Sequence, residues 1–338
     1  MSTENIRTYD VIVIGAGPVG ENVADRTAAA GLSTVIVESE LAGGECSYWA
    51  CEPSKALLRP VLLRADAVHV PGIHPAVKEP LDIDAVLAHR DRMSADWKDD
   101  GQVEWIKSVG IDLLRGHGRL AGKREVSVET PDGGTVRLRA RHAVAVCTGS
   151  RAALPPLPGI ESLGPWTSRD ATSARKPPGR LVVVGAGVVG VEMATAWQAL
   201  GSRVTLLARE DGLLPRADTE AVPGVVFTDP EVASVGLTVR EAELTGRAVE
   251  VVDHEIGHLA GALQYRPDYR GKARILIDRD RQVVVGATFA GPGIGELLYS
   301  ATIALTAEVP VDRLWHAVPA FPTISEVWLR LLETRRDS

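Results

Sequence analysis

The chain opens on a hydrophobic pattern in which two short apolar runs flank an amphipathic stretch. Residues 11–14 and 34–37 are continuously apolar, which predicts two buried parallel strands. Residues 21–30 between them predict a helix that ends at Gly31. A strand–helix–strand unit of this kind is typical of an α/β fold with a parallel sheet.

A glycine-rich turn joins the first strand to the helix, and an acid closes the second strand. The turn reads Gly15-Ala16-Gly17-Pro18-Val19-Gly20, and the acid is Glu38. The first two glycines permit a sharp turn close to a pyrophosphate, and the third permits tight packing of the helix on the strand. We expect Gly15, Gly17, Pro18, Gly20 and Glu38 to bind a dinucleotide, with Glu38 accepting hydrogen bonds from ribose hydroxyls. The alternative is a tight turn without a ligand.

The same pattern returns in the second half of the chain. Residues 181–184 and 204–207 predict strands on either side of a helix that ends near Leu200. The turn between the first strand and the helix contains Gly185, Gly187 and Gly190. These three glycines predict a second dinucleotide site.

The second unit lacks the acid at the end of its second strand. Ala208 and Arg209 stand there, and Arg216 follows. A missing carboxylate together with a nearby cation favours a ribose 2′-phosphate, and therefore NADPH over NADH. Alternatively, both arginines are solvated surface charges.

Composition and charge narrow the class of protein. The 338 residues suffice for two or three domains, and 45 % hydrophobic with 24 % charged residues is typical of a globular chain. The net charge of -7 gives no support for nucleic-acid binding, and no apolar run is long enough to span a membrane. Three cysteines and a polar stretch at residues 1–10 predict a cytoplasmic protein.

Two of the cysteines, Cys46 and Cys51, stand five residues apart. On a regular helix their Cα atoms would be about 8.5 Å apart, whereas a disulfide tolerates at most about 7 Å. A bond between them therefore requires a distorted turn, and strain of that kind suits a catalytic disulfide. From the spacing alone, two buried cysteines in a helix remain an equal alternative.

The cysteines lie in the segment Gly43-Gly44-Glu45-Cys46-Ser47-Tyr48-Trp49-Ala50-Cys51-Glu52-Pro53-Ser54-Lys55. With the preceding dinucleotide turn, it resembles the FAD-dependent pyridine nucleotide-disulfide oxidoreductases, a family that includes dihydrolipoamide dehydrogenase, glutathione reductase and mercuric reductase. The resemblance implies a Rossmann-like FAD-binding domain, a second Rossmann unit for NAD(P) and an α+β dimerisation domain.

The resemblance also implies roles for particular residues. Cys46 would exchange with the substrate, Cys51 would face the flavin, and Lys55 would lie beside flavin N5 and pair with Glu192. Further contacts with FAD are implied for Gly43, Gly44, Gly118, Thr148 and Gly149.

The remaining elements are expected from local patterns. Residues 83–97 predict a helix, 126–129 and 136–139 a β-hairpin, and 143–146 a further buried strand. Cys147 stands where the family has alanine, and we expect it to be a small buried residue. Further strands are expected at 248–252, 273–277 and 283–287, and helices at 295–307 and 325–333.

The second Rossmann unit ends early. The resemblance places an FAD-binding domain at 1–150, a partial NAD(P) unit at 165–218 and a dimerisation domain at 219–335. By that comparison, roughly 110 residues of the nucleotide-binding part are missing. Two strands and one helix cannot cover both faces of a sheet, so we expect an exposed hydrophobic surface there.

The C-terminal motif departs from the family at the position of its catalytic histidine. The segment reads Phe321-Pro322-Thr323-Ile324-Ser325-Glu326, so Glu326 is present but Phe321 cannot act as a general base. His316 would replace it only if the backbone takes a different path. Exchange with a disulfide substrate is therefore in doubt, while transfer to a quinone or another acceptor does not need this base.

A second motif, His254-Glu255-Ile256-Gly257-His258, matches the His-Glu-x-x-His sequence motif of zinc peptidases. That chemistry needs a helix, whereas the preceding residues 249–253 have a strand pattern. We expect no metal site there.

We therefore expect a homodimeric flavoprotein that passes electrons from NADPH (NADH is less favoured) through FAD and Cys46–Cys51 to a small-molecule acceptor, with a role in cell redox homeostasis. The alternative is a catalytically impaired dimeric scaffold derived from this family, since parts of both nucleotide sites are missing.

Overall fold

A computed structural model describes residues 6–209 and 222–337. The chain divides into two compact units, Met1–Leu57 with Asp84–Lys176, and Leu58–Ile83 with Pro177–Ser338. The described strands form sheets of six, five and two strands. The α/β class expected from the sequence is confirmed, because the parallel strands alternate with helices in the first unit and an antiparallel sheet follows near the C-terminus.

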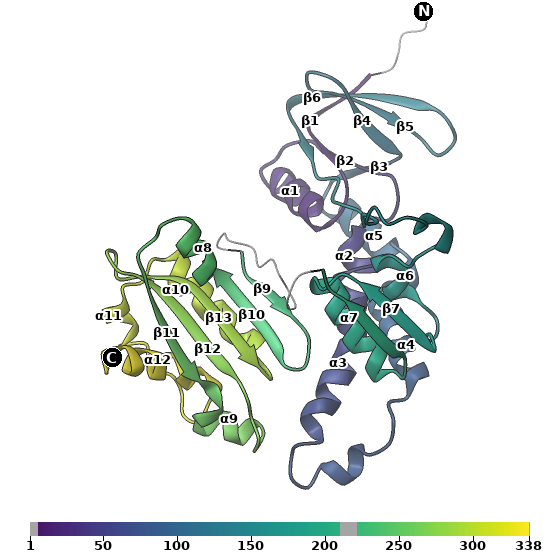
Figure 1. Ribbon diagram of the computed structural model, residues 1–338. Coiled ribbons are helices and arrows are strands. Elements are labelled where there is room, and N and C mark those ends of the chain that lie inside the picture. The colour runs from purple at the N-terminus through teal and green to yellow at the C-terminus, as the bar shows by residue number, and fades with distance from the viewer. Residues whose placement is uncertain (1–5, 210–221, 338) are drawn as a thin grey trace, which may run out of the picture. The chain divides into compact units, whose positions relative to one another are not determined.

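The six-stranded sheet of the first unit has the order β3-β2-β1-β6-β5-β4 (Figure 1). Its central strand β1 pairs in parallel with β2 and β6, whereas β5 is antiparallel to both of its neighbours. The strands are β1 (Ile6–Ile14), β2 (Thr34–Glu38), β3 (Asp112–Arg115), β4 (His117–Gly122), β5 (Glu125–Glu129) and β6 (Thr135–Val146).

Helices α1 (Pro18–Ala29) and α5 (Asp100–Ser108) pack on this sheet and contribute to its core. The other helices of the unit are α2 (Gly44–Tyr48), the start of α3 (Cys51–Ala67), α4 (Ile83–Met93) and α6 (Ser168–Ser173), with short 3-10 turns η2 (Ala95–Trp97) and η3 (Glu161–Leu163). Residues 11–14 of β1 are all buried, with Val11 and Val13 in one hydrophobic cluster and Ile12 and Ile14 in another. A continuous apolar run is thus buried on both faces of the sheet, as the pattern predicted.

Two expectations for this unit were wrong in detail. The strands expected at 136–139 and 143–146 form the single strand β6, which pairs with β5 at its start and with β1 along its length. The helix expected over 83–97 ends at Met93, because Ala95, Asp96 and Trp97 all have positive φ angles. Local sequence patterns do not reveal that a strand pairs with neighbours on both of its sides. They also do not reveal that the residues after a helix adopt the left-handed conformation.

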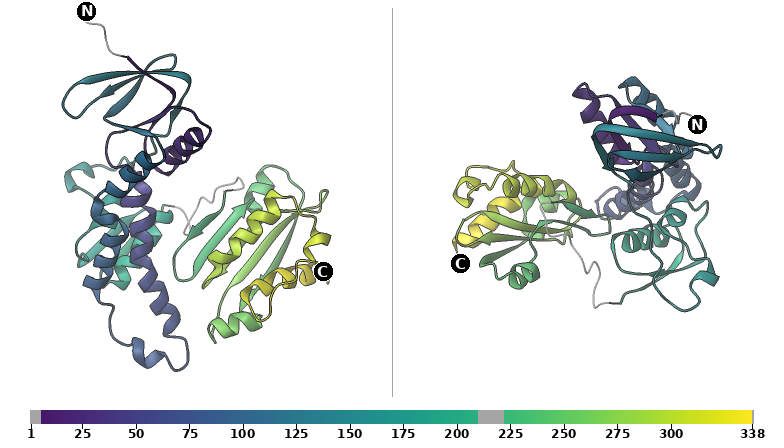
Figure 2. Two further views of the ribbon diagram at one scale, coloured as in Figure 1. Left: turned by 180° about the vertical axis from the view of Figure 1, so that it is seen from behind. Right: turned by 90° about the horizontal axis from the view of Figure 1, so that it is seen from above.

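The five-stranded antiparallel sheet lies in the second unit, with the order β11-β12-β13-β10-β9 (Figure 2). Its strands are β9 (Gly224–Val226), β10 (Glu231–Gly236), β11 (Val249–Glu255), β12 (Lys272–Asp278) and β13 (Val284–Gly291). The helices are α8 (Val239–Leu244), α9 (Ala260–Tyr265), α10 (Leu298–Thr306), α11 (Val311–Leu314) and α12 (Val327–Arg336), with 3-10 turns η1 (His74–Val77), η4 (Ile256–His258), η5 (Ile294–Leu297) and η6 (Ile324–Glu326).

This sheet has its own hydrophobic core. Helices α10 and α12 share one cluster with buried strand residues such as Ile275 and Phe289, while Ala242 of α8 packs with Leu276 in another. Because Ile275 and Leu276 are adjacent in β12, the two clusters lie on opposite faces of the sheet.

The second glycine-rich unit forms a sheet of only two strands, β7 (Arg180–Val184) and β8 (Arg203–Leu207), with helix α7 (Val188–Ala199) between them. One face leaves Val182, Val184 and Leu207 61 %, 54 % and 51 % exposed. The exposed hydrophobic surface expected from the sequence is therefore confirmed.

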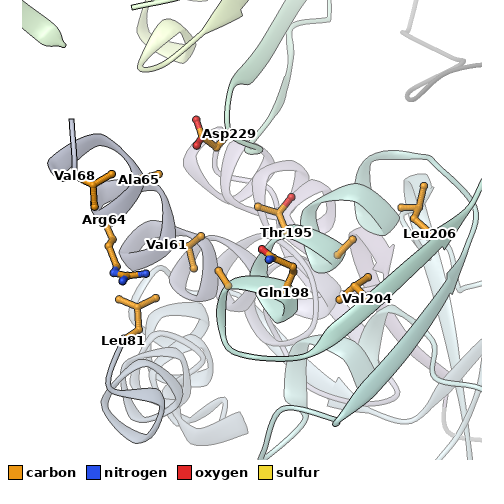
Figure 3. Close-up of a pocket in the computed structure, with 12 residues that line it drawn as sticks. Val61, Arg64, Ala65, Val68, Leu81, Thr195, Gln198, Val204, Leu206 and Asp229 are labelled. Atoms are coloured by element: carbon orange, nitrogen blue, oxygen red, sulfur yellow. The ribbon is translucent and has the colours of Figure 1, made fainter. Parts of the chain in front are cut away.

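The opposite face of this sheet is only partly covered by α7. A cavity of about 690 Å³ lies beside it, with Leu206 of β8 and Gln198 of α7 on one side and Val61 and Arg64 of α3 on the other (Figure 3). The lining is largely aliphatic, and the three glycines of the turn are not among the residues that form it.

Candidate functional site

The first dinucleotide turn has the backbone geometry that its glycines predicted. Gly15 has a φ of 103°, and a Cβ there would lie 2.3 Å from the Cys147 carbonyl oxygen at the end of β6. A Cβ on Gly20 would lie 1.9 Å from the Gly15 carbonyl oxygen. Both positions therefore need glycine, one for conformation and close approach, the other for packing of α1 on β1.

The Glu38 carboxylate is fixed at the end of β2, beside the turn. Its Oε2 accepts a hydrogen bond from the Ala16 amide at 2.7 Å, and its Oε1 accepts one from the Glu40 amide at 2.7 Å. Each carboxylate oxygen can accept a further hydrogen bond. Glu38 is thus oriented by the backbone while it keeps acceptor capacity for a hydroxyl group.

The turn forms an open cradle that fits the pyrophosphate of a dinucleotide. Gly17 caps the N-terminus of α1, Pro18 occupies its first turn, and a Cβ on Gly17 would meet no atom within 4 Å. The free N–H groups and the positive dipole end of α1 point into this space. The residues present therefore fit the ADP half of FAD.

A second turn adjoins this cradle and leads to the cysteines. The Gly43 amide donates to the Ala16 carbonyl at 2.7 Å, and a Cβ on Gly44 would lie 2.8 Å from the Gly17 Cα. Both glycines have positive φ angles, 109° and 61°. The two predicted FAD-binding segments are thus brought together by backbone contact.

The dithiol lies where one helix ends and the next begins. Cys46 is in α2, which ends at Tyr48, and Cys51 is the first residue of α3. Trp49 between them has φ -136° and ψ -1°, which interrupts the helix. This break is the distortion that the spacing required, and it places the two thiols close enough for Cys51 to influence the pKa of Cys46.

The two sulfurs have different surroundings. Cys46 is half-buried, whereas Cys51 is exposed, and both are free thiols. Burial, followed by the hydrogen bond to Cys51, raises the pKa of the Cys46 thiol to about 12. The raised pKa keeps the Cys46 thiol protonated at neutral pH.

Of the other predicted FAD-contact residues of this unit, Thr148 and Gly149 lie at the carboxyl edge of its parallel strands, directly after β6. Lys55 is half-buried and stands four residues after Cys51, on the same face of α3. Thr148 and Gly149 follow β6, and both are exposed. Gly118 packs tightly, since a Cβ there would lie 3.1 Å from Val37 Cγ1. Ligands bind at this edge of α/β sheets.

Cys147 does not have the environment that we expected. It is half-buried rather than buried, and Val146 before it is 58 % exposed. Burial raises the pKa of the Cys147 thiol. The burial expected for the strand at 143–146 was also wrong, because Ala143 and Val146 are exposed and the two residues between them are only half-buried where β6 ends at the surface of the unit.

The second dinucleotide turn repeats the first. Gly185 has a φ of 115°, a Cβ on Gly190 would lie 2.3 Å from the Gly185 carbonyl oxygen, and Gly187 is the open cap of α7. Arg209 is exposed just beyond β8. Arg216 lies outside the described residues.

Glu192 is buried in α7, with 2 % exposure, and its Oε1 accepts a hydrogen bond from the Phe227 amide at 3.2 Å. Glu192 and Lys55 belong to different compact units. Their pairing stays a prediction.

The residues of the C-terminal motif differ in their exposure to solvent. Glu326 is buried and caps the turn η6, because its carboxylate accepts a hydrogen bond from the Thr323 amide at 3.1 Å. Phe321 is 75 % exposed, and His316 is exposed just beyond α11. The structure thus gives Glu326 a capping contact, and its catalytic role stays a prediction.

The zinc-peptidase string is not on a helix of the required kind. His254 lies in β11 and His258 in the 3-10 turn η4. Among residues 6–209 and 222–337, no group of three side chains is arranged to hold a metal ion. In the same part of the chain, every helix is too short or too polar to cross a bilayer.

Sequence reasoning missed the residues that hold the segment between the cysteines. Trp97 Nε1 donates to the Tyr48 carbonyl, and Thr172 Oγ1 donates to the Trp49 carbonyl, each at 2.9 Å. The signal that could have found them is Pro53, which lacks an N–H and leaves the Trp49 carbonyl without its helical donor.

Comparison with known proteins identifies the class. Residues 9–225 match the model of the pyridine nucleotide-disulphide oxidoreductase family, and residues 222–331 match that of its dimerisation domain. The chain therefore belongs to the pyridine nucleotide-disulphide oxidoreductase family.

Individual relatives agree with this assignment. Dihydrolipoyl dehydrogenase 3 of Pseudomonas putida is 34 % identical over 274 residues, which cover 77 % of this chain and 57 % of the relative. Mercuric reductase of Serratia marcescens is 28 % identical over 95 % of this chain and 74 % of the relative. The chain spans little more than half the length of the first of these relatives.

A solved structure shares the fold. The Cu(II) complex of the HOCl-induced flavoprotein disulfide reductase RclA from Escherichia coli has a TM-score of 0.78 at 16 % identity, covering 97 % of this chain and 99 % of that chain.

Proposed function

We propose that this protein is a flavin-dependent oxidoreductase that uses NAD(P)H to reduce a disulfide formed by Cys46 and Cys51. The observation that carries the proposal is the placement of the two neighbouring thiols, on either side of a helix break, directly after a glycine turn that contacts the first nucleotide cradle. The electrons would go on to a small-molecule acceptor, either a disulfide, a quinone or another compound.

The residues of the first unit would divide the work. Gly15, Gly17 and Gly20 shape the phosphate cradle, and Glu38 orients the ribose. When bound, FAD supplies the capacity to take up a hydride from NAD(P)H and to pass two electrons on. One NAD(P)H and one proton reduce the disulfide to two thiols: the S–S bond breaks, and each sulfur ends with one proton. Cys46 would retain its proton at neutral pH because of its raised pKa.

A visible spectrum tests the proposal. We expect the purified chain to show a flavin band at about 450 nm, which NADPH bleaches in the absence of oxygen. Thiol titration before and after reduction should release one disulfide. A folded but colourless protein that does not take up added FAD would contradict the proposal.

We further propose NADPH as the preferred donor, because Arg209 follows β8 where an acid would accept the ribose hydroxyls of NADH. Arg209→Ala should raise KM for NADPH about tenfold, the effect of one charge-assisted hydrogen bond, and leave KM for NADH unchanged. Arg203→Ala is the matched control, because Arg203 is an exposed arginine at the opposite end of the same strand. Equal losses with both nucleotides would contradict the preference.

The residue at position 321 bears on the identity of the electron acceptor. Phe321 provides no proton for dithiol–disulfide exchange, so transfer to a quinone is favoured over reduction of a small disulfide. Homodimer formation through the dimerisation domain and a cytoplasmic location complete the proposal.

The second candidate is a catalytically impaired scaffold that keeps the dimerisation domain. The two-stranded sheet with its exposed valines favours it, since a complete NAD(P) domain would cover these residues. A colourless dimer with a normal melting transition would support the scaffold over the enzyme.

A further inference from the structure

The backbone between the two cysteines contains a carbonyl group, that of Trp49, that has no hydrogen-bond donor within the neighbouring helices. Trp49 interrupts the helix between α2 and α3. Its carbonyl lies just before the first turn of α3, and the residue four positions later is Pro53, which has no N–H to donate. A part-buried carbonyl that is left unpaired costs free energy. A donor from elsewhere in the chain must therefore hold this segment.

Helix α6 supplies that donor from far along the sequence. Thr172 is 2 % exposed, and the shortest of its three hydroxyl contacts, 2.9 Å, is to the Trp49 carbonyl. Figure 1 shows α6 beside α2. The Thr172 hydroxyl therefore holds the Trp49 carbonyl, which lies between Cys46 and Cys51 in the sequence.

A second residue of α6, Arg169, holds the Trp49 side chain. Its guanidinium lies 3.9 Å from the centre of the Trp49 ring. It also donates two parallel hydrogen bonds to the Glu40 carboxylate, at 2.8 and 2.9 Å, and two to the Glu45 carboxylate next to Cys46, one of them at 2.6 Å. Arg169 thus pairs with both carboxylates, and these partners, first of all Glu40, raise the pKa of Arg169.

Helix α6 is itself anchored by a buried arginine. Arg90 of α4 is 1 % exposed and donates to the Thr172 and Ala174 carbonyls at 2.6 and 3.1 Å. Its guanidinium also lies over the Trp97 ring, 5.3 Å from the centre, and Trp97 Nε1 donates to the Tyr48 carbonyl. Arg90 is therefore connected through Thr172 to the Trp49 carbonyl and through Trp97 to the Tyr48 carbonyl.

We propose that Thr172 and Arg169 are positioning residues for the Cys46–Cys51 pair, and that α6 thereby sets how readily the two thiols close to a disulfide. The proposal rests on the proposed redox use of the pair. Holding the two sulfurs near each other raises their effective concentration. The contacts of Thr172 and Arg169 therefore favour the disulfide over the dithiol.

The test measures the equilibrium of the pair against glutathione. In that reaction the two protein thiols are oxidised to one disulfide, and one oxidised glutathione is reduced to two glutathione molecules. Purified full-length protein is equilibrated in glutathione buffers, quenched with an alkylating agent and analysed by mass spectrometry. We expect Thr172→Val and Arg169→Met each to lower the equilibrium constant for disulfide formation about fivefold, and Thr172→Ser to restore the native value.

Ser173→Ala is the matched control, because Ser173 lies on the same helix and its hydroxyl donates to the Arg169 carbonyl instead of the dithiol segment. Should Thr172→Val fail to fold, Arg169→Met carries the test, since the Arg169 side chain is 39 % exposed. Constants within twofold of the native one in both variants would overturn the inference while leaving the proposed function standing. A native pair that never oxidises in these buffers would overturn both.

Discussion

Cys51→Ser is expected to halve the number of electrons that the flavoprotein can store. A flavin and a disulfide together take up about four electrons, and the flavin alone takes up two. Anaerobic titration with dithionite should therefore need about two equivalents for the native chain and about one for the variant. Dithionite is chosen because it does not depend on the NAD(P) site.

The physical reason is that both sulfurs must be present to accept a pair of electrons. Cys51 begins α3 and lies near enough to Cys46 to influence its pKa. Serine is similar in size and suits a helix N-terminus, so the fold should remain. Reduction of a small disulfide should fall by on the order of 10³-fold or more, whereas electron transfer from NADPH to a quinone should continue.

The third cysteine provides the control. Cys147 is half-buried at the end of β6. Cys147→Ser should leave the titration at the native stoichiometry. A Cys51→Ser protein that still takes up two equivalents would rule out the Cys46–Cys51 disulfide as the second electron store.

Much of the first unit could be predicted because its signals are local. The glycine turn, the acid at Glu38 and the apolar run of β1 are all encoded within a short stretch, and the structure places them together. The break between α2 and α3 was also foreseeable, since the spacing of Cys46 and Cys51 is incompatible with a regular helix that brings the sulfurs together.

What could not be predicted depends on contacts between distant residues. The hydrogen bond from Thr172 to the Trp49 carbonyl joins residues 123 positions apart, and Thr172 belongs to none of the motifs recognised in the sequence. The continuous strand β6 depends likewise on pairing with β1 across most of the unit. Cys147 was expected to be buried because it stands where the family has alanine, but burial is decided by where the strand ends.

The second glycine unit shows the limit of motif reasoning in another way. Its turn has the same geometry as the first, with Gly185 and Gly190 in the same relation as Gly15 and Gly20. Yet β7 and β8 form a sheet of only two strands, whereas β1 and β2 belong to a sheet of six. A correct nucleotide turn therefore does not ensure a complete nucleotide domain.

The two glycines Gly17 and Gly20 allow the fold and the cofactor site to be separated by mutation. Gly20→Ala should lower the free energy of unfolding by about 3 kcal/mol, because the added Cβ would lie 1.9 Å from the Gly15 carbonyl oxygen and must push α1 away from β1. The displaced helix also removes the N–H groups that face the phosphates. We therefore expect loss of bound FAD together with a lower melting temperature.

Gly17→Ala adds the same methyl group only three residues earlier, where it would meet no protein atom within 4 Å and where φ is an ordinary -77°. Its melting temperature without FAD should stay close to the native value. Because the methyl group points into the open cradle, however, FAD should bind at least tenfold more weakly, as expected when backbone approach to a pyrophosphate is blocked. The measurement is thermal unfolding of both variants with and without added FAD. Native affinity for FAD in Gly17→Ala would show that the cofactor does not lie against this turn, and native stability in Gly20→Ala would show that the helix does not pack on the strand as closely as the structure indicates.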